Sequence, residues 1–309
     1  MLIPDSPLPN ISPIKRIAAI AKLSAPLRLA IFLGALSIFW LPLALPIYWL
    51  LRSDSNLASI LTMGLLFVEL LFGWHFWGKF VHGDRHIYAR YGLVSTRKNI
   101  REFWQGLAIG FWLCLGLFIT EALLGWINVL QPSASLIRII IEGWFSAIGI
   151  ALAEELLFRG WLLDELQRDY GQKICVAVTA IAYAIAHFLK PMEEIIRTAV
   201  TFPALVLLGI ALVLAKYQHG DRALKDTAPH KAFPEGNRLG ISIGIHGGLV
   251  WGYYIVHVGQ LIEYNGQVPD WVTGIDGNPI AGVMGLIFLS GLTLKIMLSN
   301  RLSKEDRLS

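Results

Sequence analysis

Charged residues and cysteines are both scarce in this sequence. Charged side chains make up only 16% of the 309 residues, whereas hydrophobic side chains make up 55%, far from the balance of a soluble globular protein. The two cysteines, Cys114 and Cys175, lie within apolar runs. They are therefore expected to be small core residues, and a disulfide framework is excluded. The composition indicates an integral membrane protein.

The sequence also has no internal repeat, no low-complexity tract and no alternating pattern of the kind that builds β-barrel strands. Nothing in the first 26 residues resembles a signal peptide, because no short apolar core precedes a small-residue cleavage site. We predict an all-α polytopic protein with about eight transmembrane helices, arranged as an N-terminal segment (1–28), a membrane domain (29–298) and a tail (299–309). The apolar runs that predict the spans are 29–51, 57–78, 106–130, 139–161 (with its helix running on to 167), 174–189 (short for a span), 198–215, 240–259 and 280–297.

The positive charges are distributed unevenly between these runs. With the N-terminus inside, 21 of the 26 Lys and Arg residues fall on the inner side and four on the outer side; Lys295, within the last run, is not counted. Positive charge is enriched in cytoplasmic loops. Both termini and the loops 79–105 and 216–238 are therefore predicted to be cytoplasmic. The basic loops are expected to face anionic membrane lipids, and no nucleic-acid partner is expected.

Two adjacent carboxylates stand near the end of the fourth run. The stretch Glu154-Glu155-Leu-Leu-Phe-Arg159 places an arginine four residues after the second glutamate. Residues four apart share a helix face, so Glu155 and Arg159 are predicted to pair. Glu154 has no cation on its own face. Since a carboxylate in hydrocarbon is costly, the two acids indicate either a functional site or a capped pair at a buried helix end.

Two histidines supply further polar groups within the membrane runs. His187 follows Tyr183 by four residues, and His246 precedes Gly247 and Gly248, which allow close backbone approach. Each histidine alone is compatible with a simple hydrogen bond to a neighbouring helix. Together with the two glutamates they supply a base, an acid and a polarising group, and ionisable residues in spans tend to mark function.

These motifs resemble those of the CPBP family of CAAX-processing and bacteriocin-immunity-related intramembrane proteases, which includes the CAAX prenyl endopeptidases. The family pattern is Glu-Glu-x-x-x-Arg, then an aromatic residue four before a His, then His-x-x-x-Asn or Asp. The chain matches the first at Glu154 to Arg159 and the second at Tyr183 to His187; at the third, His246 is followed by Val250 where the family has Asn or Asp. The resemblance covers roughly residues 139–257.

The resemblance implies an intramembrane endopeptidase that cuts a membrane-anchored peptide, for which a prenylated CAAX peptide is the best-known example. Glu154 would activate a water molecule with His187, Glu155 would be held charged by Arg159, and His246 would donate to the oxyanion. Family members have been described both as metalloproteases and as glutamate-dependent proteases. Glu154, His187 and His246 would be the ligands if a zinc ion were bound. Since the chain has no His-Glu-x-x-His, catalysis without a cofactor is favoured.

Two other functional classes stay open at this stage. Glu69, His75 and Glu121 fall within the second and third runs and could form a proton or ion path, as in a transporter. The loss of an oxyanion donor at Val250 favours a membrane scaffold that keeps the fold without the chemistry.

The predicted spans also conflict with a common site for the two glutamates and the two histidines. Glu154 and His246 lie near the cytoplasmic ends of their spans, whereas His187 lies about 20 Å along its own span.

Overall fold

The computed structural model describes residues 17–219 and 237–305, and the chain divides into two compact units at Tyr88 and Ala89. Seven of the described helices are long and apolar enough to cross a membrane, and an eighth apolar helix is shorter. The prediction of an all-α polytopic membrane protein is confirmed. The candidate spans are Ala25–Leu50, Ser55–His82, Arg97–Leu123, Leu136–Gln167, Met192–Tyr217, Gly240–Val258 and Val283–Asn300; the shorter helix is Gln172–Ala186.

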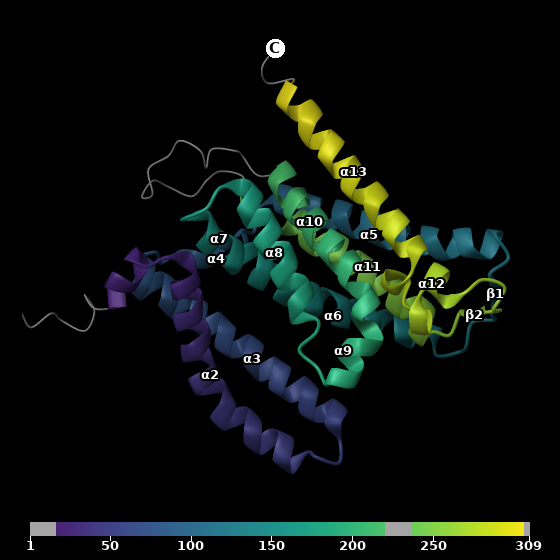
Figure 1. Ribbon diagram of the computed structural model, residues 1–309, viewed down its shortest axis with the longest axis horizontal. Helices are drawn as coiled ribbons and strands as arrows, with labels where there is room; N and C mark the ends of the chain where they lie inside the picture. Colours follow the sequence, from purple (N-terminus) through teal and green to yellow (C-terminus); the bar gives the residue numbers. More distant parts are fainter. Residues whose placement is uncertain (1–16, 220–236, 306–309) are drawn as a thin grey trace, which may run out of the picture. The chain divides into compact units, whose positions relative to one another are not determined.

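The first unit is built on a helical hairpin (Figure 1). A short helix η1 (Ile20–Lys22) precedes α2 (Ala25–Leu50), and α3 (Ser55–Trp77) continues into the π-helical turn η2 (Gly78–His82). Asp54 begins α3 by accepting a 2.9 Å hydrogen bond from the Leu57 amide, as an N-cap residue does. Across the hairpin, the Trp40 indole donates to the Thr62 carbonyl at 3.1 Å. The side chain of Thr62 also bonds the Tyr48 hydroxyl at 3.0 Å.

The second unit contains the remaining elements. Helix α4 (Ile87–Tyr91) crosses the boundary between the units, and the order thereafter is α5 (Arg97–Leu123), β1 (Ile127–Val129), α6 (Leu136–Glu155), η3 (Leu156–Leu162), α7 (Leu163–Gln167), α8 (Gln172–Ala186), α9 (Met192–Thr198), η4 (Ala199–Thr201), α10 (Phe202–His219), α11 (Gly240–Val258), β2 (Ile262–Tyr264), α12 (Asp270–Thr273), η6 (Ile275–Gly277), η7 (Pro279–Ala281) and α13 (Val283–Glu305). Helix α11 packs against both α5 and α6, and α10 packs against α8 and α13.

A two-stranded antiparallel sheet corrects the predicted end of the third span. The apolar run 106–130 was expected to be helical throughout, but α5 ends at Leu123 and β1 pairs with β2, with Ile127 opposite Tyr264. Gly125, at a positive φ of 77°, turns the chain between them. A glycine adopts this conformation without strain. Ile127 then joins the buried cluster around Phe118 and Val256.

Helices α5 and α11 approach so closely that only glycine fits between them. A Cβ atom on Gly110 would lie 2.1 Å from the carbonyl oxygen of Ile245, and one on Gly248 would lie 2.3 Å from that of Leu107. Small residues at every fourth position allow such contacts between membrane helices. The same backbone contact is made at Gly106 and Gly244. The crossing fixes the position of α11, and with it that of His246.

Replacing Gly110 with alanine should therefore destabilise the fold. The added methyl group meets backbone, which cannot rotate away, so the expected cost is about 1–3 kcal/mol in the free energy of unfolding. Thermal unfolding in detergent measures it. Gly149→Ala in α6 is the matched control, because nothing lies within 4 Å of its new Cβ. Equal stability of the two variants would contradict the close crossing.

The predicted orientation in the membrane can be tested with single cysteines. Ser95, just before α5, and Ser133, just before α6, are both exposed, whereas the native cysteines are buried. In intact cells a membrane-impermeant maleimide should label Ser133→Cys and should label Ser95→Cys only after permeabilisation, because the Lys/Arg excess places residues 79–105 inside. The reverse labelling would invert the topology. Most of the loop 216–238 lies outside the described residues.

Candidate active site

The predicted pair of Glu155 and Arg159 is confirmed. Arg159 Nη1 donates to Glu155 Oε1 at 2.9 Å, and both side chains are fully buried. Arg159 Nη2 donates to the Gly209 carbonyl of α10 at 3.2 Å, and the guanidinium carbon lies 4.4 Å from the centre of the Tyr183 ring. The arginine therefore joins α6, α8 and α10 around one buried carboxylate.

The helix changes its winding directly after the two glutamates. Residues 156–162 form the π-helical segment η3 within an otherwise continuous helix from Leu136 to Gln167. A π-turn widens the helix and is frequent at functional sites.

The Lys216 ammonium donates to the carbonyl oxygens of Arg159, within this π-helical segment, and of Tyr91. Lys216 was assigned to a hydrophilic loop from the sequence; it is instead a buried residue of α10, and no local pattern distinguishes it from the loop residues that follow.

His187 is the C-terminal cap of α8. Its Nδ1 atom lies 2.8 Å from the carbonyl oxygen of Tyr183. A carbonyl only accepts, so Nδ1 carries the proton, and in the neutral ring Nε2 is left as an acceptor. Nε2 lies 3.9 Å from Glu154 Oε2. The hydrogen bond to Tyr183 thus aims a basic nitrogen at the carboxylate.

His246 connects the two glutamates. Its Nδ1 lies 3.0 Å from Glu155 Oε1, the oxygen that also accepts from Arg159, and its Nε2 lies 3.8 Å from Glu154 Oε2. Glu154 Oε2 is itself buried and has no hydrogen-bond partner among the described residues. Distances of 3.8–3.9 Å are too long for direct hydrogen bonds, and such gaps are commonly bridged by a third group. Glu154 and the two ring nitrogens therefore surround one small polar space.

Tyr183 packs at the centre of these groups. Its ring is 4.6 Å from that of His187 and 6.1 Å from that of His246, measured between centroids. The prediction that Tyr183 and His187 share a helix face is confirmed, and the same aromatic ring also contacts the Arg159 guanidinium.

The expected difference in depth does not keep Glu154 and His187 apart, because their side chains lie 3.9 Å from each other. The helix of the fourth span was expected to run on to Gln167, and it does, so Glu154 lies about 20 Å before its end. Helix α8 starts after a short turn, at Gln172, and its 15 residues extend about 22 Å. Since the hydrocarbon core is about 30 Å thick, α8 is too short to cross it. The two neighbouring helices therefore bring Glu154 and His187 to the same level.

One of the groups that suggested an ion path, Glu121, lies outside this site. Glu121 is buried at the far end of α5, where the Tyr264 hydroxyl donates to it at 3.2 Å. Glu69 and His75 belong to the other compact unit. Within the described residues, Glu121 is thus tied to the small sheet and not to Glu154.

The side chains that would hold zinc do not meet its geometry. Donors around a tetrahedral zinc ion with bonds of about 2.0–2.1 Å lie about 3.3 Å apart, whereas Glu154 Oε2 is 3.9 and 3.8 Å from the two ring nitrogens. No group of three or more His, Cys, Asp or Glu side chains in the described parts of the chain is arranged to hold a metal ion.

Comparison with known proteins identifies the segment that carries this geometry. Residues 133–224 match the model of a family described as type II CAAX prenyl endopeptidase Rce1-like. The matched segment is Rce1-like. It contains Glu154, Glu155, Arg159, Tyr183 and His187, and this confirms the resemblance to the CAAX-processing proteases. No curated protein and no solved structure matches the chain.

His246 lies outside the Rce1-like segment, on α11. Val250, one helical turn later, is partly buried and offers no hydrogen-bond donor where the family motif has Asn or Asp. The structure nevertheless brings His246 to both glutamates. The chain is therefore an integral multi-pass membrane protein with one segment that is similar to the CAAX prenyl endopeptidases.

Proposed function

We propose that this protein is an intramembrane endopeptidase that cleaves a membrane-anchored peptide, with a prenylated CAAX-type peptide as the candidate substrate. The observation that carries the proposal is the position of Glu154 Oε2, 3.9 Å from His187 Nε2 and 3.8 Å from His246 Nε2. A partly exposed carboxylate between two imidazoles, backed by a buried ion pair, is suited to acid–base chemistry.

Glu154 and His187 activate the water. In the ionised carboxylate and the neutral ring, both facing atoms accept hydrogen bonds, so a bridging water donates one proton to each. A water oxygen about 2.8 Å from both atoms fits a separation of 3.9 Å. Its lone pair then points away from both acceptors, towards the scissile carbonyl carbon.

The water oxygen bonds to the carbonyl carbon while Glu154 takes up one of its protons. The negative charge develops on the former carbonyl oxygen. His246 stabilises that charge by donating from Nε2–H, while its Nδ1–H donates to Glu155 and holds the ring in place. Collapse breaks the carbon–nitrogen bond, and Glu154 returns the proton to the leaving amine.

Arg159 and Tyr183 act by positioning. Arg159 keeps Glu155 charged within the bundle, and Glu155 in turn orients His246. Tyr183 holds the rings of both histidines. Membrane lipids surround the site, and we propose that it operates without a metal cofactor.

The substrate class is tested with purified protein in lipid bilayers. Matched peptides that share one sequence and carry either a prenyl group or a simple acyl anchor are incubated with the wild type. Cleavage of the prenylated peptide at one bond supports the full proposal. Cleavage of both peptides at similar rates restricts it to membrane-anchored peptides in general. Absence of any cleavage contradicts it.

Substituting Val250 with asparagine should raise turnover. Four residues return to nearly the same helix face, so the amide would stand beside His246 and add a donor to the oxyanion. One such donor is typically worth about 10²–10³-fold in kcat. The gain should fall on kcat with little change in KM, because the new bond forms chiefly in the transition state. Steady-state kinetics with a prenylated peptide measure it.

Val250→Thr is the matched control, because it adds a shorter polar side chain of similar volume. A folded Val250→Asn protein with unchanged turnover would place the oxyanion elsewhere. If neither the wild type nor Val250→Asn cleaves any peptide, the second candidate function gains support, that of a membrane scaffold with the protease fold. The observation that favours this alternative is Val250 itself.

A further inference from the structure

Lys295 lines an apolar cleft that includes none of the proposed catalytic residues. The cleft lies between α5, α11 and α13 and has a volume of about 420 Å³, within the range of small-molecule sites, roughly 300–1,000 Å³. Its apolar walls are formed by Ala108, Ile109, Ile241, Ile245, Leu292 and Ile296. The remaining lining side chains are Gln105, Lys295 and Ser299.

Lys295 is a cation within an apolar helix. It forms no hydrogen bond or ion pair with the residues that the structure describes. The α13 stretch Val283–Asn300 has no acidic residue, and neither has α10, which packs against it. On α5, the carboxylate one turn from the cleft, Glu102, is already bound by Arg238 at 2.8 and 3.0 Å. The protein therefore supplies a positive charge here without a described negative partner.

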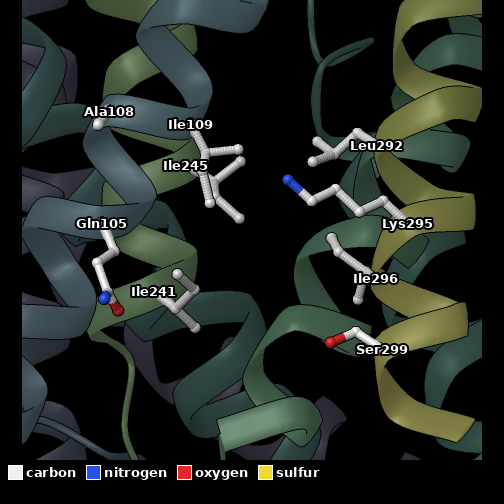
Figure 2. A pocket seen from close by; sticks show the side chains of 9 residues that line it. All are labelled: Gln105, Ala108, Ile109, Ile241, Ile245, Leu292, Lys295, Ile296 and Ser299. Atoms are coloured by element: carbon white, nitrogen blue, oxygen red, sulfur yellow. The ribbon is translucent and has the colours of Figure 1, made fainter. Parts of the chain in front are cut away.

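The direction of the lysine side chain separates a binding site from ordinary snorkelling. A lysine near the end of a membrane helix usually bends its amine towards the water at that end. Figure 2 shows the Lys295 amine reaching across the cleft towards Ile109 and Ile245, away from Ser299. Lys295 is exposed on α13, and its charge is presented to the apolar cleft.

The polar groups give the cleft two different ends. Gln105 and Ser299 stand on opposite walls at one end, whereas Leu292 and Ala108 lie towards the other (Figure 2). In the predicted topology the end with Gln105 and Ser299 faces the cytoplasm. A ligand that matches this order has a hydroxyl-bearing head, a negative charge next to it and apolar chains beyond.

We propose that this cleft binds one anionic phospholipid of the surrounding bilayer. Lys295 holds the phosphodiester, Gln105 and Ser299 bond the headgroup, and the acyl chains follow the isoleucine walls. An unpaired membrane cation in an apolar cleft is complementary to such a lipid, and basic pockets between membrane helices are known lipid-headgroup sites. The proposal does not depend on proteolysis.

Native mass spectrometry of the purified protein in neutral detergent tests the lipid preference. Phosphatidylglycerol and phosphatidylcholine with identical chains are titrated separately, together with the free headgroup glycerophosphoglycerol. The wild type should bind one phosphatidylglycerol at least about fivefold more tightly than phosphatidylcholine, the value of one lysine near an anionic headgroup. Equal affinity for both lipids would overturn the proposal, and so would equally tight binding of the free headgroup, because no acyl chain would then be needed.

Variants locate the site. Lys295→Met should reduce phosphatidylglycerol binding to the phosphatidylcholine level, and Lys295→Arg should retain the preference. Lys98→Met, which removes an exposed lysine at the start of α5, is the control and should bind as the wild type does. Ala108→Phe, which fills the cleft, should weaken both lipids. A Lys295→Met protein that retains the full preference would place the lipid elsewhere, and thermal unfolding without lipid checks that each variant is folded.

Discussion

Replacing Glu154 with glutamine should abolish peptide cleavage and leave the amount of folded protein close to that of the wild type. The amide has the same shape as the carboxylate, and the side chain is 28% exposed, so little packing changes. Glutamine cannot accept the proton of water. General base catalysis contributes about 10²–10⁴-fold, and the rate of cleavage should fall by at least that factor. Cleavage of a prenylated peptide and thermal unfolding are measured on the same preparation.

Glu142→Gln is the matched control for this variant. Glu142 lies on the same helix but is exposed, and among the described residues it pairs with Arg138 alone, so its loss should leave cleavage unchanged. If both variants lose cleavage to a similar extent, cleavage depends on the negative charge of α6 and not on a base at the site. Misfolding of Glu154→Gln would contradict its assignment as a residue that acts on substrate.

Replacing Arg159 with alanine should strongly destabilise the fold. The substitution leaves Glu155 buried without its cation, and removing one partner of a buried pair typically costs about 3–5 kcal/mol. It also removes the donor to Gly209 and the contact with Tyr183. We expect a large fall in folded yield and in the unfolding temperature, measured in detergent, with loss of cleavage as a consequence.

The chain offers a control with the same spacing on the same helix. Arg138 and Glu142 also pair at i, i+4, at 2.6 Å, but their side chains are 79% and 45% exposed. An exposed pair of this kind contributes only about 0.3–0.5 kcal/mol. Arg138→Ala should therefore unfold close to the wild-type temperature. If Arg138→Ala and Arg159→Ala are equally stable, the buried pair does not hold the site together.

The sequence predicted those parts of the site that depend on spacing along one helix. Glu155 with Arg159, and Tyr183 with His187, are four residues apart and do meet. The apolar runs also predicted the membrane helices, because the hydrocarbon core requires long uncharged segments. Both features follow from the helical repeat and from the apolar interior of the bilayer. Residue spacing and hydrophobicity along the chain are therefore enough to predict them.

Other features depend on contacts that spacing does not encode. The burial of Lys216 beside the π-helical segment 156–162 requires groups from α4, η3 and α10 to meet. The three-residue strands are too short to show alternation, and their pairing is set by a partner more than 130 residues away. The meeting of Glu154 and His187 depends on how their two helices pack, which spacing along the chain does not show.

The proposed attack by water is tested most directly by isotope incorporation. The purified protein cleaves a membrane-anchored peptide in water enriched in oxygen-18, and mass spectrometry reads the new C-terminus. Water activated by Glu154 adds one heavy oxygen to the newly formed carboxylate, and Glu154→Gln forms no such product. A wild-type enzyme that yields no labelled C-terminus from any membrane-anchored peptide would contradict the proposed protease.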